Sequence, residues 1–337
     1  MKVFFRILLL GLALMTGCSR FTTDDDGRIG LSISIGNLDI ESKVATADAY
    51  DETMMSAENP FETAMWFSLD ENSFRNTPDA FTSLPCYTTM NFANTGITYA
   101  SYKPSDGAER DLKYPIPVSG EAAPVYCVGF HPSTGWTGSS DGVNATRAIT
   151  GSDDIMFAPK ISGNWIERFG PQTYQHQLTW LKINVCATTV EAGKQWGNIA
   201  KVEVMSDEYI NIDLSDGTGK VSYINPTTDD YYITTYENTA VGAENDPSNQ
   251  LTLTSTEVGS VFCSPETSYN IRLTMFSGVV KTITIPLKDL SGNFLTSESQ
   301  AKGKLFVINL YFQPFAIVEG TSMLYYWNNK NEDLLPE

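Results

Sequence analysis

The sequence predicts an all-β protein that consists of β-sandwiches. Three observations carry this prediction. Many short segments alternate between apolar and polar residues, which is the period of a half-buried strand. Clusters of Gly, Pro, Asn, Asp and Ser separate these segments at roughly ten-residue intervals, as turns do in sandwiches. No segment sustains a helical period over three turns, since even VEAGKQWGNIA (residues 190–200) is interrupted by two glycines.

The chain begins with an export signal, MKVFFRILLLGLALMTGCSR. Lys2 and Arg6 form a charged region before an apolar run from Ile7 to Met15. This run is too short to span a bilayer, so we expect residues 1–17 to be a cleaved signal peptide. The residues LMTGC, which end at Cys18, resemble a bacterial lipobox, in which the Cys thiol takes a diacylglycerol and becomes the new N-terminus. The alternative is an ordinary signal peptide with an incidental cysteine.

An acidic stretch, TTDDDG at residues 22–27, follows the cysteine. It resembles the tract that sends some lipoproteins of anaerobic Gram-negative bacteria to the outer face of the outer membrane. A solvated tether and a degenerate calcium loop are the alternatives. The calcium interpretation is weak, because DDDG lacks the alternate-residue spacing of an EF-hand.

The first predicted strand comes next, at IGLSISIGNL (residues 29–38). Ile29, Leu31, Ile33 and Ile35 alternate with small or polar residues, as in a half-buried strand. Lys43, a basic residue at which a protease can cut, follows shortly after it. A core strand thus lies between a lipid attachment site and a cleavable residue.

Later strands follow from the same alternation. A β-hairpin is predicted over residues 267–287, with Ser277 and Gly278 at its turn. The other clear strand candidates are Val125–Phe130, Leu178–Ala187, Lys201–Met205, Tyr231–Tyr236 and Leu251–Ser255.

Two domains are expected after the signal peptide, because roughly 320 residues exceed what one hydrophobic core usually organises. The Gly- and Ser-rich region from Pro132 to Gly163 predicts a run of long loops, and Phe169-Gly170-Pro171 is a strong breaker. We therefore assign residues 18–43 to a lipidated tether with the first strand, residues 44–170 to one sandwich and residues 171–337 to a second.

The charge excludes some partners. The formal charge of −18 comes from 40 acidic and 22 basic residues. It argues against nucleic acid and against anionic membrane surfaces, both of which require a basic face. The cysteines other than Cys18 have no Cys or His at metal-ligand spacing, so zinc and haem are not expected. Disulfide pairing and burial as small apolar side chains both remain open for these cysteines, which are Cys86, Cys127, Cys186 and Cys263.

No catalytic pattern is visible, so we expect neither an enzyme nor a cofactor. Asp153-Asp154 could form a site, but such a pair more often marks a turn before a strand. His131 and His176 have no nucleophile nearby in an elbow context, and no glycine-rich phosphate loop occurs. The tryptophans could form a glycan-stacking platform or could fill sandwich cores; they are Trp66, Trp136, Trp165, Trp180, Trp196 and Trp327.

Three features, taken in order, resemble the fimbrillin family, the Mfa-like and FimA-like pilin lipoproteins of anaerobic Gram-negative bacteria. The first is the lipoprotein start with its early strand and basic residue. The second is the series VYCVGFHP, GSDDIMFA and YQHQLTWLKINV, which covers residues 125–132, 151–158 and 174–185. The third is a pair of apolar strands near the C-terminus that close on a tryptophan. His131 departs from the tyrosine that is usual at its position.

The resemblance implies two transthyretin-like β-sandwich domains in tandem and a structural, adhesive role. Fimbrillins are exported as lipidated precursors, and a protease then removes the first strand outside the cell. A C-terminal strand of the neighbouring subunit fills the groove. The implied partners are other pilin subunits in a homo- or heteropolymer, the outer membrane through the lipid of the precursor, and ligands on host or bacterial surfaces. The implied location is the cell surface, and the pilus after processing.

The candidate donor strand lies in GKLFVINLYFQPFAIVEGTSMLYYWNN, residues 303–329. Ile317, Met323, Tyr325 and Trp327 are its candidate anchors, and Leu324 and Tyr326 make the opposite face apolar as well. The alternative is that these residues form ordinary last strands of the C-terminal sandwich.

The processing site departs from the family pattern. Related pilins are usually cut after an arginine in the loop that follows the first strand, where this chain has Lys43, while Arg28 precedes the strand. Cleavage at Lys43 would remove strand and lipid, cleavage at Arg28 would remove the lipid alone, and an uncut subunit could act only as an anchor. A non-polymerising surface lipoprotein that binds glycans through an aromatic patch is the alternative function.

Overall fold

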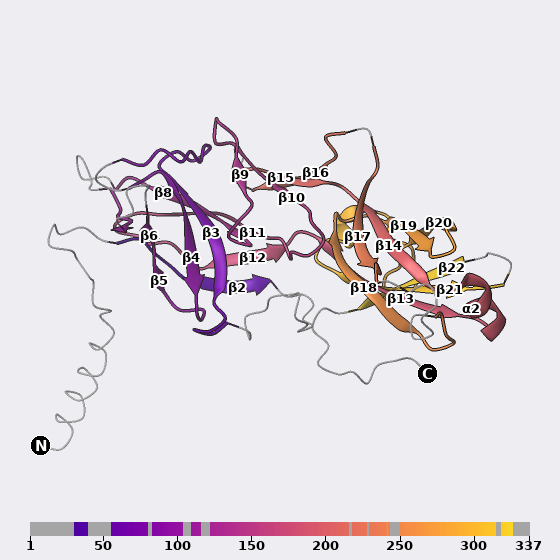
Figure 1. Cartoon of the computed structure of the whole chain (residues 1–337). Coiled ribbons are helices and arrows are strands. Elements are labelled where there is room, and N and C mark those ends of the chain that lie inside the picture. The colour runs from indigo at the N-terminus through magenta and orange to yellow at the C-terminus, as the bar shows by residue number, and fades with distance from the viewer. Residues whose placement is uncertain are drawn as a thin grey trace, which may run out of the picture.

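The computed structural model shows a chain built almost entirely from β-strands (Figure 1). This architecture confirms the all-β prediction. Among the described residues, no helix has the length and apolar character needed to cross a membrane. The structure describes residues 30–39, 55–79, 83–103, 109–115, 122–215, 218–227, 229–240, 242, 250–314 and 318–325.

A six-stranded sheet organises the N-terminal half, on the left of Figure 1. Its strand order is β2-β12-β11-β8-β3-β4, and β2 lies at one edge, parallel to β12. The bounds are Ile35–Asp39 (β2), Gln172–His176 (β12), Met156–Gly163 (β11), Val125–His131 (β8), Phe61–Ser68 (β3) and Cys86–Phe92 (β4).

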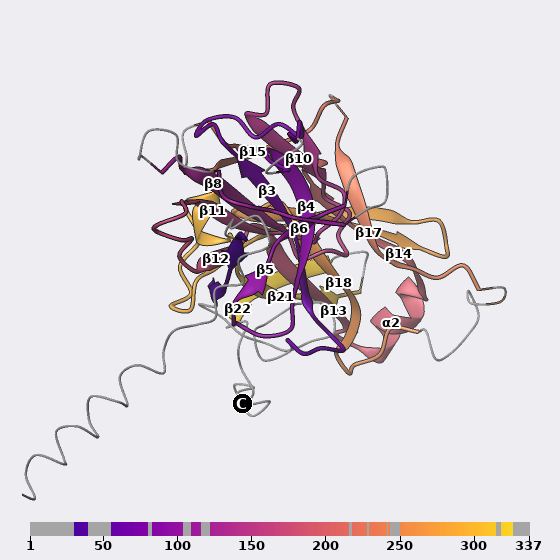
Figure 2. The ribbon, with the colours of Figure 1, turned by 90° about the vertical axis from the view of Figure 1, so that its left-hand side faces the viewer.

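Short strand pairs supplement this sheet. Figure 2 looks at this end of the molecule and shows β3–β6 and β8 in front of the C-terminal strands. The pairs are β1 (Ser32–Ile33) with β5 (Thr98–Tyr99), and β6 (Ser101–Tyr102) with β7 (Arg110–Asp111).

The C-terminal half contains two four-stranded sheets, β18-β13-β21-β22 and β17-β14-β19-β20. Alternate residues of β13 and β19 are buried, as in a sandwich. The bounds are Thr256–Cys263 (β18), Thr179–Ala187 (β13), Leu305–Phe312 (β21), Val318–Tyr325 (β22), Tyr231–Glu237 (β17), Ile199–Ser206 (β14), Ser268–Met275 (β19) and Val280–Pro286 (β20).

A fourth sheet joins the two halves, with the order β16-β15-β10-β9. The hairpin of β15 (Tyr209–Asp213) and β16 (Lys220–Ile224) leaves the C-terminal half and pairs with β10 (Asn144–Ala148), which pairs with β9 (Thr137–Gly138). The division into two domains at residue 170 stays a prediction.

Most strand predictions are confirmed, including the hairpin of β19 and β20. Gly278 takes a φ of 83° at its turn, a conformation that glycine adopts without steric cost. The prediction of a strand over Leu251–Ser255 is wrong, because β18 begins only at Thr256. Leu251 is buried while Leu253 is 57% exposed, so the two leucines do not share one face of an extended strand.

The prediction of long loops over residues 132–163 is also wrong. This region contains β9, β10 and the whole of β11. The small and polar residues of β10 show no strand pattern in the sequence. Strand β11 carries a register shift between Ala158 and Ile161, where Pro159 can omit its ladder hydrogen bond.

A two-turn helix, α2 (Val190–Trp196), occupies the glycine-interrupted segment. The Thr189 hydroxyl accepts a hydrogen bond from the Ala192 amide at 3.0 Å and caps its N-terminus. The helix ends where Gly197 takes a φ of 71°. A short 3₁₀ turn, η4 (Glu298–Gln300), precedes β21.

Candidate functional site: the first strand and the C-terminal edge

The first strand is a core element of the N-terminal half. Leu31, Ile33 and Ile35 are 0%, 1% and 2% exposed. They pack in a hydrophobic cluster with residues of the six-stranded sheet, among them Phe61 and Tyr174. The described part of the predicted strand is therefore confirmed as a buried strand, while Ile29 lies outside the described residues.

The segment changes partners half-way along its length. Upstream, the Leu31 amide donates to the Leu112 carbonyl at 2.8 Å, and the Ala100 amide donates to the Leu31 carbonyl at 2.9 Å. Downstream, the Gln172 amide donates to the Ser34 carbonyl at 2.9 Å, and β2 continues parallel to β12. The segment thus bridges the β5 region and the edge of the main sheet, so its removal would open both.

Tyr174 of β12 lies at the centre of a group of buried side chains from the six-stranded sheet. The Tyr174 hydroxyl lies 2.7 Å from Thr63 Oγ1 and 3.1 Å from Met65 Sδ. Burial raises the pKa of Tyr174, so the phenol stays neutral. A Cβ at Gly129 would collide with that hydroxyl, so the glycine lets the Tyr174 side chain lie against the backbone of β8.

The sequence placed Tyr174 and His176 at the entrance to a strand but did not predict Gln172–His176 as a strand of its own. In the structure, Gln172, Tyr174 and His176 are buried while Thr173 and Gln175 between them are exposed. Because the buried Gln172 and His176 are polar, this alternation of burial is not visible as an alternation of apolar residues in the sequence.

The C-terminal candidate divides into two strands of different character. Strand β21 is an internal strand between β13 and β22, and five of its eight residues are buried. Strand β22 is an edge strand with none of its eight residues fully buried. Met323 is 41% exposed, while Leu324 and Tyr325 pack partly against the core.

Several predicted site residues lie outside the described part of the chain. These are the lipidation candidate Cys18, the processing candidates Arg28 and Lys43, and the donor candidates Ile317 and Trp327. Their assignments stay predictions.

The acidic pair and the histidines form polar contacts, of which the one between His176 and Asp154 is buried. Arg147 Nη2 donates to Asp153 Oδ2 at 2.5 Å, and His176 Nδ1 lies 2.9 Å from Asp154 Oδ1. His131 Nδ1 lies 2.7 Å from the Glu62 carbonyl. These contacts fix the residues around β10 and β12 in place, as a structural network does.

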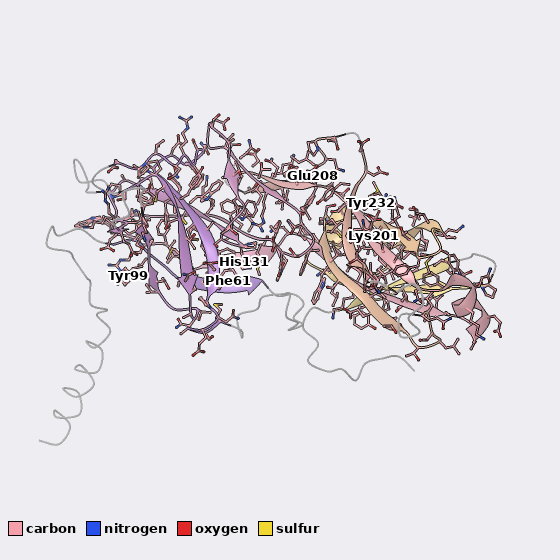
Figure 3. The ribbon with its side chains drawn as sticks, in the orientation of Figure 1. Phe61, Tyr99, His131, Lys201, Glu208 and Tyr232 are labelled. Atoms are coloured by element: carbon pink, nitrogen blue, oxygen red, sulfur yellow. The ribbon has the colours of Figure 1, made fainter. Side chains whose placement is uncertain are left out.

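His131 also stacks on Phe61, with ring centroids 4.7 Å apart, and the two side chains lie together in Figure 3. Desolvation by burial is the main cause that lowers the pKa of His131, and the hydrogen bond to Glu62 partly opposes it. A neutral imidazole suits a ring packed against an aromatic side chain.

The cysteines of the described chain are unbridged. Cys86, Cys127 and Cys263 are buried, and Cys186 is partly exposed. Burial raises the pKa of Cys86 to about 12. Within the described ranges, no group of three or more His, Cys, Asp or Glu side chains is arranged to hold a metal ion.

Among the residues that the structure describes, the tryptophans do not form one exposed platform. Trp66, Trp180 and Trp196 are at most 5% exposed, whereas Trp165 is 38% exposed. Trp66 instead stacks on Tyr87 within the fold, with centroids 3.9 Å apart. These three buried rings cannot stack on a glycan.

Comparison with known proteins shows the fold. No family model matches the sequence, and no curated protein matches it. A solved structure of a candidate cell adhesion protein from Bacteroides uniformis aligns with 90% of this chain and 99% of its own, with a TM-score of 0.52 and 14% identity.

Two further structures give lower scores. A candidate cell adhesion protein from Bacteroides ovatus has a TM-score of 0.45 and 13% identity, over 90% of this chain and 99% of its own. A candidate polysaccharide-binding protein from Bacteroides thetaiotaomicron has a TM-score of 0.44 and 8% identity, over 80% and 89%. At these identities the likeness of the first structure concerns the fold alone, and the scores of the other two add nothing to it.

Proposed function

We propose that this protein is an adhesive pilus subunit of the fimbrillin type, exported as a lipoprotein and polymerised by strand donation. The observation that carries the proposal is the complete burial of Leu31, Ile33 and Ile35 in a segment close to the chain's start. The candidate adhesion role of the Bacteroides uniformis protein, which has the same fold, supports the adhesive part.

The free energy of burying the first strand is large enough for its removal to require a replacement strand. Burial of each large aliphatic side chain contributes about 1.5–3 kcal/mol, so Leu31, Ile33 and Ile35 together contribute roughly 4.5–9 kcal/mol. A typical domain is stable by only about 5–15 kcal/mol. A subunit without this strand would be barely stable and would expose the edge of β12, which another strand could cover.

The edge strand β22 is the better donor of the two C-terminal strands. Strand β21 lies between β13 and β22 in its sheet, so removing it would separate these two strands and disrupt the sheet. Within the described ranges, strand β22 pairs with β21 alone, and its partly exposed Met323, Leu324 and Tyr325 leave apolar surface for a second partner. Burial of that surface in the groove of another subunit would drive polymerisation.

Processing decides the place of the subunit in the fibre. Cleavage at Lys43 opens the groove and releases the lipid, which makes a shaft subunit. A chain that keeps both the strand and acylated Cys18 cannot accept a donor and anchors the fibre at the outer membrane.

Peptide complementation tests the exchange. A chain that begins at Val44 is refolded from urea with a peptide of residues 29–38, and native structure is followed by amide hydrogen exchange. We expect the peptide to restore protection in β8 and β12, because it refills the groove. A peptide with Ile33→Asp should fail, since it would bury an unpaired charge. A control peptide with Ser34→Asp should succeed, because Ser34 is only half-buried.

The proposal is wrong if the chain from Val44 folds to full protection without any peptide. It is also wrong if the Ile33→Asp peptide restores protection as well as the unmodified one does. Either result would show that the buried face of the first strand does not complete the core.

A further inference from the structure

A cavity lies where the two halves of the molecule meet, away from the first strand. Its volume is about 320 Å³, within the range of small-ligand sites. One wall comes from β11 and β12 of the six-stranded sheet, and the other comes from β16 and the η4 turn. Strands β11, β12 and β16 lie near the middle of the molecule (Figure 1). Because strands from both halves build it, the fold holds the cavity open in a defined shape.

Two aromatic rings form the rigid part of the lining. Phe157 is 2% exposed, and Gly219 packs so closely against its ring that a Cβ there would collide with it. The Tyr223 hydroxyl donates to the Gln177 carbonyl at 2.5 Å, which ties β16 to the start of β13. Burial raises the pKa of Tyr223, so this hydroxyl stays protonated and the ring stays fixed.

Polar groups of several kinds complete the lining. Gln175 provides an amide, Ser299 a hydroxyl, Glu298 a carboxylate and Lys302 an ammonium group. Within the part of the chain that the structure describes, neither Glu298 nor Lys302 forms a salt bridge. Burial lowers the pKa of Lys302, which indicates that its ammonium is partly removed from water.

These groups together match one ligand chemistry. A partly exposed aromatic ring such as that of Tyr223 can pack against the C–H face of a sugar. Amide, hydroxyl, carboxylate and ammonium groups satisfy hydroxyls that both donate and accept. The lining carries one positive and one negative side chain, so it offers no net charge to an ionic ligand. The chain's net charge of −18 further disfavours an anion.

We propose that the cavity between β11, β12, β16 and η4 binds one unit of a neutral saccharide. The sugar ring packs beside Tyr223, which is only partly buried, and its hydroxyls bond to Gln175, Glu298 and Lys302. This site would give an adhesive subunit a glycan contact that does not depend on strand exchange.

Saturation-transfer NMR on the full mature chain tests the site. The probes are glucose, galactose, mannose, fucose and N-acetylglucosamine at roughly millimolar concentration, the range of weak single-unit binding, with N-acetylneuraminic acid as an anionic probe. We expect at least one neutral sugar to bind. Ser299→Trp should abolish binding, because Ser299 is exposed and a large ring there fills the cavity without altering the core.

Charge variants resolve the polar contacts. Glu298→Gln should weaken binding about ten- to a hundredfold, the usual loss of a hydrogen bond to a charged group. Matched controls are Glu237→Gln on β17 and Lys281→Met on β20, which do not line the cavity and should leave binding unchanged.

Three results would overturn the proposal. They are the absence of binding by every neutral sugar, binding that Ser299→Trp leaves intact, and a preference for the anionic sugar that Lys302→Met abolishes. None of these results bears on peptide complementation, so failure of the saccharide site and failure of the proposed polymerisation can be told apart.

Discussion

Truncation of Ile33 tests how much the first strand contributes to its half of the molecule. Ile33→Ala removes three carbon groups from a side chain that is 1% exposed. At about 0.8 kcal/mol for each group, the transfer loss is about 2.4 kcal/mol. The cavity left behind adds to this, so the total lies in the range of about 2–5 kcal/mol measured for such truncations.

Native-state hydrogen exchange measures this loss of stability separately for each strand. Amides of β3 and β8 should exchange roughly 30- to 3,000-fold faster in Ile33→Ala, because each 1.4 kcal/mol corresponds to about a tenfold change. Amides of β19 and β21 should keep their rates. The matched control is Ile97→Ala, since Ile97 is 65% exposed and lies next to Thr98, the strand partner of Ile33. Equal effects of the two substitutions would refute the account of the first strand as a core element.

Three further predictions concern other parts of the chain. Gly129→Ala should destabilise the protein by crowding the Tyr174 hydroxyl, and Tyr174→Phe in the same chain should recover part of the loss in a urea double-mutant cycle; strict additivity would contradict the contact. In a chain without Cys18, Cys186 should react with a thiol reagent before the three buried cysteines do, and equal rates would contradict their burial. Burial, followed by the charges of Glu298 and Asp207, raises the pKa of Glu266 to about 7. The contribution of the neutral Glu266 carboxyl to folding stability is therefore fully present below the ordinary pKa of 4.5, and it is lost as pH rises through 7. Glu266→Gln should accordingly raise urea stability relative to the parent chain at pH 8 (~one unit above that pKa) but not at pH 5, and no difference between these two conditions would contradict the shift.

The sequence predicted the strands that carry a clean alternation of large apolar residues. The first strand and the β19–β20 hairpin are examples, because their burial pattern depends only on local periodicity. Strand β10 was not predicted, because Asn144–Ala148 has only small or polar side chains. This segment becomes a strand through its pairing with β15. Tertiary pairing decided this segment where local propensity did not.

The candidate site could be predicted only in part for the same reason. Alternation placed Leu31, Ile33 and Ile35 on one buried face. It could not show that the segment pairs antiparallel with β5 and then parallel with β12, because these partners are distant in the sequence. The saccharide cavity combines residues from four separated elements, so no local pattern marks it.

The central claim is that the first strand is a temporary part of the fold. The most direct measurement is the N-terminal residue and intact mass of the protein recovered from the native cell surface. The account predicts a chain that starts at Val44, without lipid, in polymers. A chain that starts at acylated Cys18 and retains Leu31, Ile33 and Ile35 in every copy would contradict exchange of this strand.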